Sequence, residues 1–181
     1  MKLLFTAAAA ASLLGGTSYA LDFDFLGGTM DGTEAGTTSD GTGVEFTGGG
    51  ANGIVYDETS NLLTFDFDYF DLESQFQSAQ VRGPASPGTQ GDLIFTLGVN
   101  QTSTTSGNVI NQSETLTDTQ EGELLLGQWY VVINTVAFPE EEGGEIRGQL
   151  VPVPEPQTYA MIGGLALLGF AGYRRFKAQV A

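Results

Sequence analysis

Within residues 62–69, the stretch 63–69 alternates apolar and polar side chains without a break. The apolar ones fall on every second position: Leu63, Phe65, Phe67 and Tyr69. Successive side chains of a strand point to opposite faces, so this pattern predicts a half-buried strand with Asp66 and Asp68 in solvent. Turn-forming residues at 57–61 and a short apolar run at 52–56 come before it, which predicts a hairpin.

Alternation interrupted by turn residues recurs along most of residues 21–152, and it predicts further antiparallel strands. These strands are expected at 21–25, 92–99, 129–137 and 144–151. Residues 27–43 are rich in Gly, Thr and Asp, and they are predicted to form a loop or a weak edge strand. Residues 82–91 are predicted to form a loop, and residues 100–113 a polar linker.

One short helix is predicted at 118–126, because Thr117 begins a Thr-x-x-Gln capping box and Gly127 follows the helix. The predicted fold class is therefore all-β, an antiparallel Greek-key sandwich of immunoglobulin-like type. Trp129 is expected in its core, because it lies on one strand face with two apolar neighbours two and four residues later.

The first 20 residues have the parts of a secretory signal peptide. A basic start at Lys2 precedes an apolar stretch at 3–14, and small residues at Ser18 and Ala20 permit cleavage after Ala20. We therefore predict export through the Sec machinery and exclude residues 1–20 from the folded domain.

The C-terminal end joins a short proline motif to an apolar block and a basic cluster. In order these are Pro154, Glu155 and Pro156, then residues 159–173, then Arg174, Arg175 and Lys177. As a helix the block spans about 22 Å, which is less than the roughly 30 Å of a hydrocarbon core. The basic cluster places the C-terminus in the cytoplasm. A single transmembrane helix that holds the chain transiently in the inner membrane is therefore expected.

This order of motif, spacer, apolar block and basic cluster resembles the PEP-CTERM sorting signal of Gram-negative bacteria. The resemblance implies recognition of the Pro-Glu-Pro region by an exosortase, removal of the tail, and delivery to the cell surface or extracellular polymer matrix. The chain then divides into a signal peptide (1–20), a β domain (21–152) and a sorting signal (153–181). A buried C-terminal helix of a globular domain is the alternative, but the block has no polar face to support it.

The part predicted to be exported is strongly acidic. All 22 acidic residues lie within 21–156 and face only Arg82 and Arg147. Nucleic acid and anionic membrane surfaces are poor partners for such a charge. The chain has no Cys and no His. It therefore lacks disulfides, thiolate chemistry, the commonest general base and the commonest transition-metal ligand.

Residues 130–135, 137–139 and 143–150 read YVVINT, AFP and GGEIRGQL. They resemble the closing signature of the CHRD domain, which is found in chordin and in many bacterial exported proteins. Residues 31–43 resemble the opening turn of that domain. Residues 79–85 stand where the family usually has a His-x-His-Gly-Pro run.

The chain departs from the family pattern at three positions. Gln80, Arg82 and Asn134 stand where the family typically carries histidines, so no metal or catalytic role is carried over. The resemblance then implies only a scaffold, made of Trp129, Tyr130, the Gly143–Gly144 turn and Arg147. Arg147 is expected to meet a nearby carboxylate.

Carboxylates are the remaining candidates for a chemical site, as ligands of Ca²⁺. The weak candidates are Asp66, Asp68 and Asp71, with Asp22 and Asp24. Alternate aspartates on a strand are also typical of a solvated face, and no EF-hand loop occurs. The acidic run 140–142 is interpreted as a charged loop tip, and Glu145 beside Arg147 as a polar pair of the fold.

The predicted function is a structural or binding role at the cell envelope, with no catalytic residue and no cofactor. Expected partners are the Sec machinery and an exosortase during export, and then a surface polysaccharide or envelope protein. One alternative is a weak calcium-binding adhesion module. A second is an enzyme derived from a metal-dependent ancestor, which the lack of His and Cys disfavours.

Overall fold

The computed structural model describes residues 20–45 and 53–153, together with Gly164, Leu167 and Phe170. The strands of the β domain are β1 (Ala20–Phe25), β2 (Met30–Asp31), β3 (Thr42–Glu45), β4 (Ile54–Asp57), β5 (Leu62–Phe70), β6 (Phe76–Gly83), β7 (Asp92–Leu97), β8 (Asn100–Gln101), β9 (Gly107–Thr115), β10 (Tyr130–Thr135) and β11 (Ile146–Pro152). Its helices are α1 (Gly32–Ala35) and α2 (Asp118–Leu125), and its 3-10 turns are η1 (Leu26–Gly28) and η2 (Glu140–Glu142).

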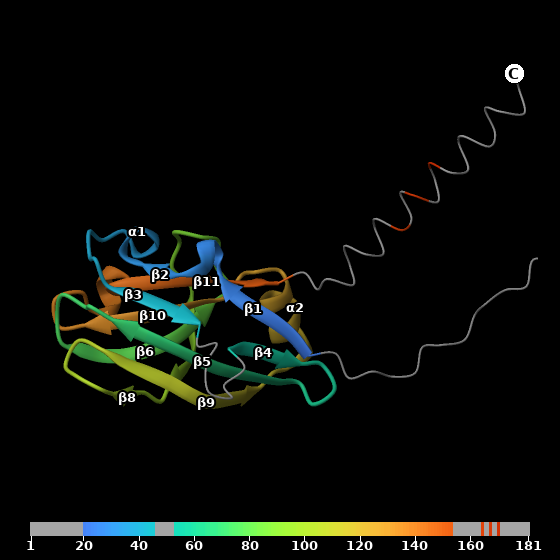
Figure 1. Cartoon of the computed structure of the whole chain (residues 1–181), viewed down its shortest axis with the longest axis horizontal. Helices are drawn as coiled ribbons and strands as arrows, with labels where there is room; N and C mark the ends of the chain where they lie inside the picture. The colour runs from blue at the N-terminus through green and yellow to red at the C-terminus, as the bar shows by residue number, and fades with distance from the viewer. Residues whose placement is uncertain (1–19, 46–52, 154–163, 165–166, 168–169, 171–181) are drawn as a thin grey trace, which may run out of the picture.

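The strands form one antiparallel, 11-stranded sheet that folds over on itself (Figure 1). β1 and β2 follow each other along one edge of β11, and β3 and β4 share one edge of β5. Since β1 also pairs with β4 and β2 with β3, these six strands close a ring. β10, β6 and β7 extend the sheet from β11, whereas β9 and β8 extend it from β5.

The all-β class is confirmed, and the strands form two layers in the manner of a sandwich, with both layers belonging to one continuous sheet. Two links make it continuous: β2 pairs with β3, and β1 pairs on both of its edges. Phe23 is opposite Ile54 on β4, and Phe25 is opposite Leu150 on β11. The strand thereby joins the two layers that an immunoglobulin-like sandwich keeps apart.

The alternation of β5 is confirmed on its apolar face and fails at one polar position. Its four alternating apolar residues are at most 1 % exposed: Leu63, Phe65, Phe67 and Tyr69. Asp66, expected in solvent, is buried because the pairing with β9 shifts register between Phe65 and Phe67. At this bulge Asp66 Oδ1 accepts a hydrogen bond from Asn111 N at 2.7 Å.

Three segments differ from their sequence-based predictions. Residues 27–43, predicted to form a loop or a weak edge strand, contain the short strand β2 and also the unpredicted α1, and they lead into β3. The predicted polar linker at 100–113 is wrong, because it contains β8 and most of β9. β9 is polar because most of one face lies in solvent, so its composition hides the strand. β6 was not predicted, since only Ala79 and Val81 of its residues pack in the core cluster as buried apolar side chains.

The predicted helix is confirmed as α2, with its capping box. Thr117 N donates to Gln120 Oε1 at 3.0 Å, and Gln120 N donates to Thr117 Oγ1 at 3.4 Å. The helix ends at Leu125, and Gly127 follows with φ of 67°. α1 is a single turn capped at its N-terminus by Asp31, whose Oδ1 accepts from Glu34 N at 2.9 Å.

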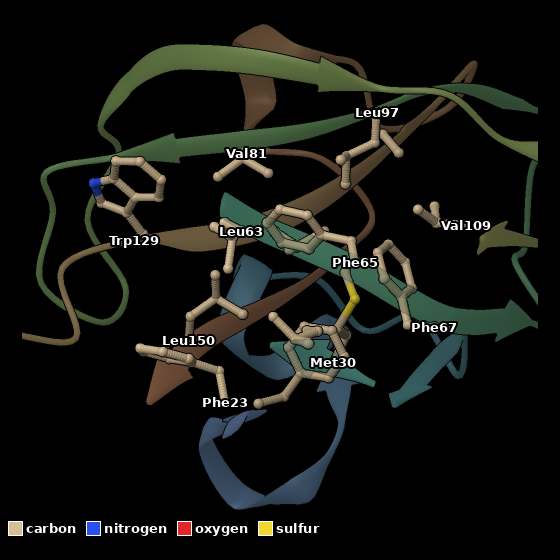
Figure 2. Packing of buried hydrophobic residues seen from close by; sticks show 14 of the residues in the cluster. Phe23, Met30, Leu63, Phe65, Phe67, Val81, Leu97, Val109, Trp129 and Leu150 are labelled. Carbon is tan, nitrogen blue, oxygen red and sulfur yellow. The ribbon is translucent and has the colours of Figure 1, made fainter. Parts of the chain in front are cut away.

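The hydrophobic core lies between the two layers of the folded sheet (Figure 2). Figure 2 shows Val81 and Leu97, from β6 and β7, facing Leu63 and Phe65 of β5. Trp129 is fully buried, as predicted. Phe95 connects the layers, because its ring lies 5.9 Å from that of Phe65 and 6.1 Å from that of Trp129, both edge-on.

Candidate functional site

The signature residues of the sequence gather on the outer side of β6, β10 and β11, away from the core. We call this surface the outer polar face; its members are Gln80, Arg82, Tyr130, Asn134, Arg147 and Gln149. The register sets Tyr130 between Arg82 and Gln149, and Val132 between Gln80 and Arg147. All residues of β10 are buried, so the outer polar face is itself covered.

Arg147 is the centre of this face. Its guanidinium carbon lies 3.4 Å from the centroid of the Tyr130 ring. Nη1 donates to Thr89 O at 2.6 Å, and Nη2 to Ser86 O at 3.3 Å and to Gln149 Oε1 at 2.9 Å. Burial lowers its pKa, although Tyr130 and Glu34 act to raise it. Within the described ranges it has no ion pair, so the expected carboxylate partner is replaced by a ring and carbonyls.

Gln149 ties the face to two loops and to α1. Its Nε2 donates to Ala85 O at 3.0 Å and to Gly127 O at 2.8 Å, and its N donates to Glu34 Oε2 at 2.9 Å. Burial raises the pKa of Glu34, against the lowering effect of the bond from Gln149 N. Arg147 and Gln149 thus hold the 84–91 loop against β11 by side-chain hydrogen bonds, and the backbone N–H of Gln149 holds α1 there.

Glu145 is a fully buried carboxylate held by neutral donors. Oε1 accepts from Ser39 Oγ at 2.7 Å and from Glu73 N at 2.6 Å, and Oε2 accepts from Thr135 Oγ1 at 2.8 Å. The opening turn and the closing signature therefore meet at this one side chain. Glu145 and Arg147, expected to form a pair, take different partners.

Gln80 and Arg82, two of the positions where histidines were expected, form a network with Glu140 of η2. Gln80 Nε2 donates to Glu140 Oε2 at 2.8 Å, and Arg82 Nη1 donates to Gln80 Oε1 at 2.9 Å and forms a salt bridge with Glu140. The bond from Gln80 and the bond from Arg82 lower the pKa of Glu140. Burial acts to lower the pKa of Arg82, but the hydrogen bond and charge of Glu140, together with Tyr130, raise it above its ordinary value. The acidic loop tip therefore folds back onto β6.

Asn134 is the third of these positions, and it lies on the same face as the other two. Its Nδ2 donates to Ser78 Oγ at 3.0 Å, while its Oδ1 is buried without a hydrogen-bond partner. The three positions thus lie on one face of two paired strands. They carry amides and a guanidinium, which do not serve as general bases at neutral pH.

The calcium candidates do not converge. Asp66 Oδ1 accepts a hydrogen bond from Asn111 N. Asp68 is half-buried, and burial raises its pKa. Asp71 is exposed and has a φ of 61°. Asp24 Oδ1 accepts from Phe25 N at 2.7 Å. In residues 20–45 and 53–153 no three His, Cys, Asp or Glu side chains are grouped so that they could hold a metal ion.

The predicted targeting residues fall at or beyond the edges of the described chain. Ala20, the predicted cleavage position, is the first residue of β1 and is opposite Asp57. Pro154, Glu155, Pro156, Arg174 and Arg175 lie outside the described residues. No helix among the described residues is long and apolar enough to cross a membrane.

Two glycines of GGEIRGQL, Gly144 and Gly148, have a structural reason that sequence alone did not reveal. Gly144 has φ of 82°, and a Cβ there would come within 2.3 Å of Val132 Cγ2. At Gly148 a Cβ would come within 2.6 Å of both Met30 and Phe25. Side chains along β11 alternate between the two faces of the sheet. This alternation is the sequence signal that distinguishes the residues facing the core from Arg147 and Gln149, which face outward.

Comparisons with known proteins agree with this account of the signature. The CHRD domain profile matches residues 30–150, well over half of the chain. No curated protein and no solved structure gives a match. The match begins at β2 and ends at Leu150 in β11, so it takes in the opening turn, the outer polar face and the closing signature. The chain belongs to the CHRD domain family.

Proposed function

We propose that the chain is an exported, non-catalytic CHRD protein whose β domain has a structural or binding role at the cell surface or in the extracellular matrix. In this proposal the Sec machinery exports the chain and the C-terminal segment holds it transiently in the inner membrane. An exosortase then recognises Pro154, Glu155 and Pro156 and removes the tail. The final partner is a surface polysaccharide or an envelope protein.

The observation that carries the proposal is the position of the two ends of the β domain. Val153 N donates to Asp22 O at 2.8 Å, and Phe23 is opposite Pro152 in the pairing of β1 with β11. The predicted signal peptide and the predicted sorting signal thus join the same end of the domain. In the sequence the proposed motif follows directly on Val153, so the proposed cleavage region begins where the described sheet ends.

The outer polar face supports a non-catalytic role. Gln80, Asn134 and Arg147 are at most 6 % exposed. Most of their polar groups are occupied by carbonyls, a hydroxyl, a carboxylate and an aromatic ring, and the buried atoms without a hydrogen-bond partner are Asn134 Oδ1 and Arg147 Nε. A substrate would have to displace the 84–91 loop to reach Arg147. These side chains therefore maintain the fold.

The test uses the full chain expressed in an exosortase-bearing host. Replacing the motif (Pro154→Ala, Glu155→Ala and Pro156→Ala together) should leave a longer, membrane-retained precursor. Deleting residues 159–181 should release the domain from the membrane. Pro152→Ala is the matched control, because it removes a nearby proline outside the motif. Mass measurement of the surface-derived wild-type protein decides the outcome, since a C-terminus still ending at Ala181 would refute the sorting proposal.

A further inference from the structure

β7 is an open edge of the sheet. In the described part of the chain it pairs with β6 alone. A strand with one unpaired edge presents free N–H and C=O groups to another chain. Proteins usually protect such edges with Lys or Pro, but β7 reads DLIFTL, with one charge at its first residue. Its edge is therefore open to strand addition.

The core is incompletely covered at this edge. Ile94, Phe95 and Val99 are only partly buried, although all three pack against the core cluster. Leu93 is 48 % exposed. Since Phe95 contacts both Phe65 and Trp129, an apolar side chain placed beside it would extend the main core.

The other free edge, on β9, is interrupted. β8 covers its beginning by pairing opposite Gly107 and Asn108. Asn111 has φ of 49°, which breaks the regular strand geometry, and Gln112 Oε1 accepts from Gly98 N at 3.1 Å. β7 also has one register shift, between Val81 and Arg82 of its partner strand, but residues 95–97 beyond it pair regularly with β6. β7 is thus the more suitable edge for a partner.

The negative charge near β7 favours a partner with basic side chains. Thr96 is opposite Gln80 and Leu93 is opposite Arg82, the two residues of β6 that hold Glu140. Their bonds hold Glu140 against the outer side of β6, the strand that pairs with β7, and Glu141 and Glu142 of the same 3-10 turn are exposed. The charge of Arg82 is offset by Glu140, so Glu141 and Glu142 give this side a negative field. All but one of the 22 acidic residues of the chain lie in the described ranges, against two arginines, which extends that field over the domain.

We infer that β7 binds an extended polypeptide segment in which apolar and basic residues alternate, added to the sheet as a strand. Main-chain hydrogen bonds to β7 hold the segment, its apolar side chains cover Phe95, and its basic side chains face Glu141 and Glu142. The inference names the partner class of the binding role proposed above and rests on it. Its test measures binding at β7 and not export, so the two can fail separately.

The test uses the full chain in a neutral detergent and a blocked peptide of alternating Lys and Val, about ten residues long. Hydrogen–deuterium exchange measured by mass spectrometry should show new protection confined to residues 92–99, and binding should weaken with salt. The control peptide has the same sequence with alternate residues N-methylated, which keeps the charge and removes strand pairing. Equal binding of both peptides would reduce the effect to charge attraction and overturn the inference.

Two matched variants locate the site. Leu93→Lys should weaken binding about tenfold, because it adds a like charge on the outer side of β7, where the basic side chains of the segment lie. Leu126→Lys makes the same change at a side chain that is 74 % exposed elsewhere, and it should bind normally. Glu141→Gln with Glu142→Gln should weaken binding about threefold, whereas Asp40→Asn with Glu58→Gln should have a smaller effect.

Three results would reject the inference. One is the absence of binding by the Lys–Val peptide. Another is protection outside residues 92–99. The third is a chain that is already dimeric and becomes monomeric with Leu93→Lys, because a second copy would then occupy the edge.

Discussion

The guanidinium carbon of Arg147 lies 3.4 Å from the centroid of the Tyr130 ring, across the pairing of β10 with β11. This contact needs a planar cation that can stack while its edges donate hydrogen bonds. Arginine has this geometry and lysine does not. This geometry gives an arginine a structural reason at this position, where it has no ion pair among the described residues.

Arg147→Lys should therefore destabilise the domain by about 2–4 kcal/mol. A buried cation–π contact contributes about 2 kcal/mol, and each carbonyl left without its donor costs about 1–3 kcal/mol. Urea unfolding followed by tryptophan fluorescence measures the change. A lysine variant as stable as wild type would show that charge alone is sufficient at this position.

Glu145→Gln should cost about 2–4 kcal/mol although it keeps the size of the side chain. Three donors converge on the carboxylate, and an amide offers one oxygen and two further donors in its place, which leaves buried groups unpaired. Glu141→Gln is the control, since that exposed position should change stability by less than about 0.5 kcal/mol. Equal midpoints for the two variants would mean that the buried network contributes little.

The fold was predictable where one strand face is apolar and the other polar. β5 and Trp129 follow this rule, because alternation directly reports burial. It failed at Asp66, where a bulge turns a polar side chain inward, and at β9, which is polar because it lies at an edge of the sheet. Neither effect is encoded in the local pattern, since both depend on which strand lies alongside.

The outer polar face was predictable only as separate residues. Family resemblance singled out Gln80, Arg82 and Asn134, and the structure places them on one face of two paired strands. The role of Glu140 could not be foreseen, because it lies 58 residues from Arg82 along the chain and meets it through η2. Long-range pairing of this kind leaves no periodic signal.

Trp129→Ala should cost about 3–5 kcal/mol, as expected for a large side chain removed from a closed core. The indole also donates from Nε1 to Glu123 Oε2 at 3.1 Å, so the substitution frees a carboxylate on α2. Thermal unfolding followed by far-ultraviolet circular dichroism measures the loss. Leu126→Ala, at a 74 % exposed position, is the control and should stay within about 0.5 kcal/mol of wild type. A small loss for Trp129→Ala would place the indole outside the core.

Calcium should leave the melting temperature unchanged. A ligand that binds only the folded state raises the melting temperature, but Asp66, Asp68 and Asp71 do not converge on one point. Melting in excess Ca²⁺ is compared with melting in excess chelator, with Mg²⁺ as the control for ionic strength. A rise specific to Ca²⁺ would show that the folded domain binds calcium and would favour the adhesion-module alternative.

Glu140 should make stability fall as the pH is lowered below about 4.5. Bonds from Gln80 and Arg82 hold its pKa in the folded state below the ordinary value of 4.5. A carboxyl with a lowered folded-state pKa contributes stability that is present above its unfolded pKa and is lost as the pH falls through the folded one. Because its side chain is 45 % exposed, the contribution is at most about 1 kcal/mol at neutral pH.

The comparison that isolates Glu140 is the stability difference between wild type and Glu140→Gln as a function of pH. The difference should be present at pH 7 and vanish in strong acid, where both proteins carry a neutral side chain. Glu34 and Asp68 act in the opposite direction, because burial raises their pKa values and acid then favours the folded state. Their contribution is common to both proteins and cancels. A difference that stays constant from pH 7 to pH 3 would mean that the contacts of Glu140 with Gln80 and Arg82 do not depend on its charge.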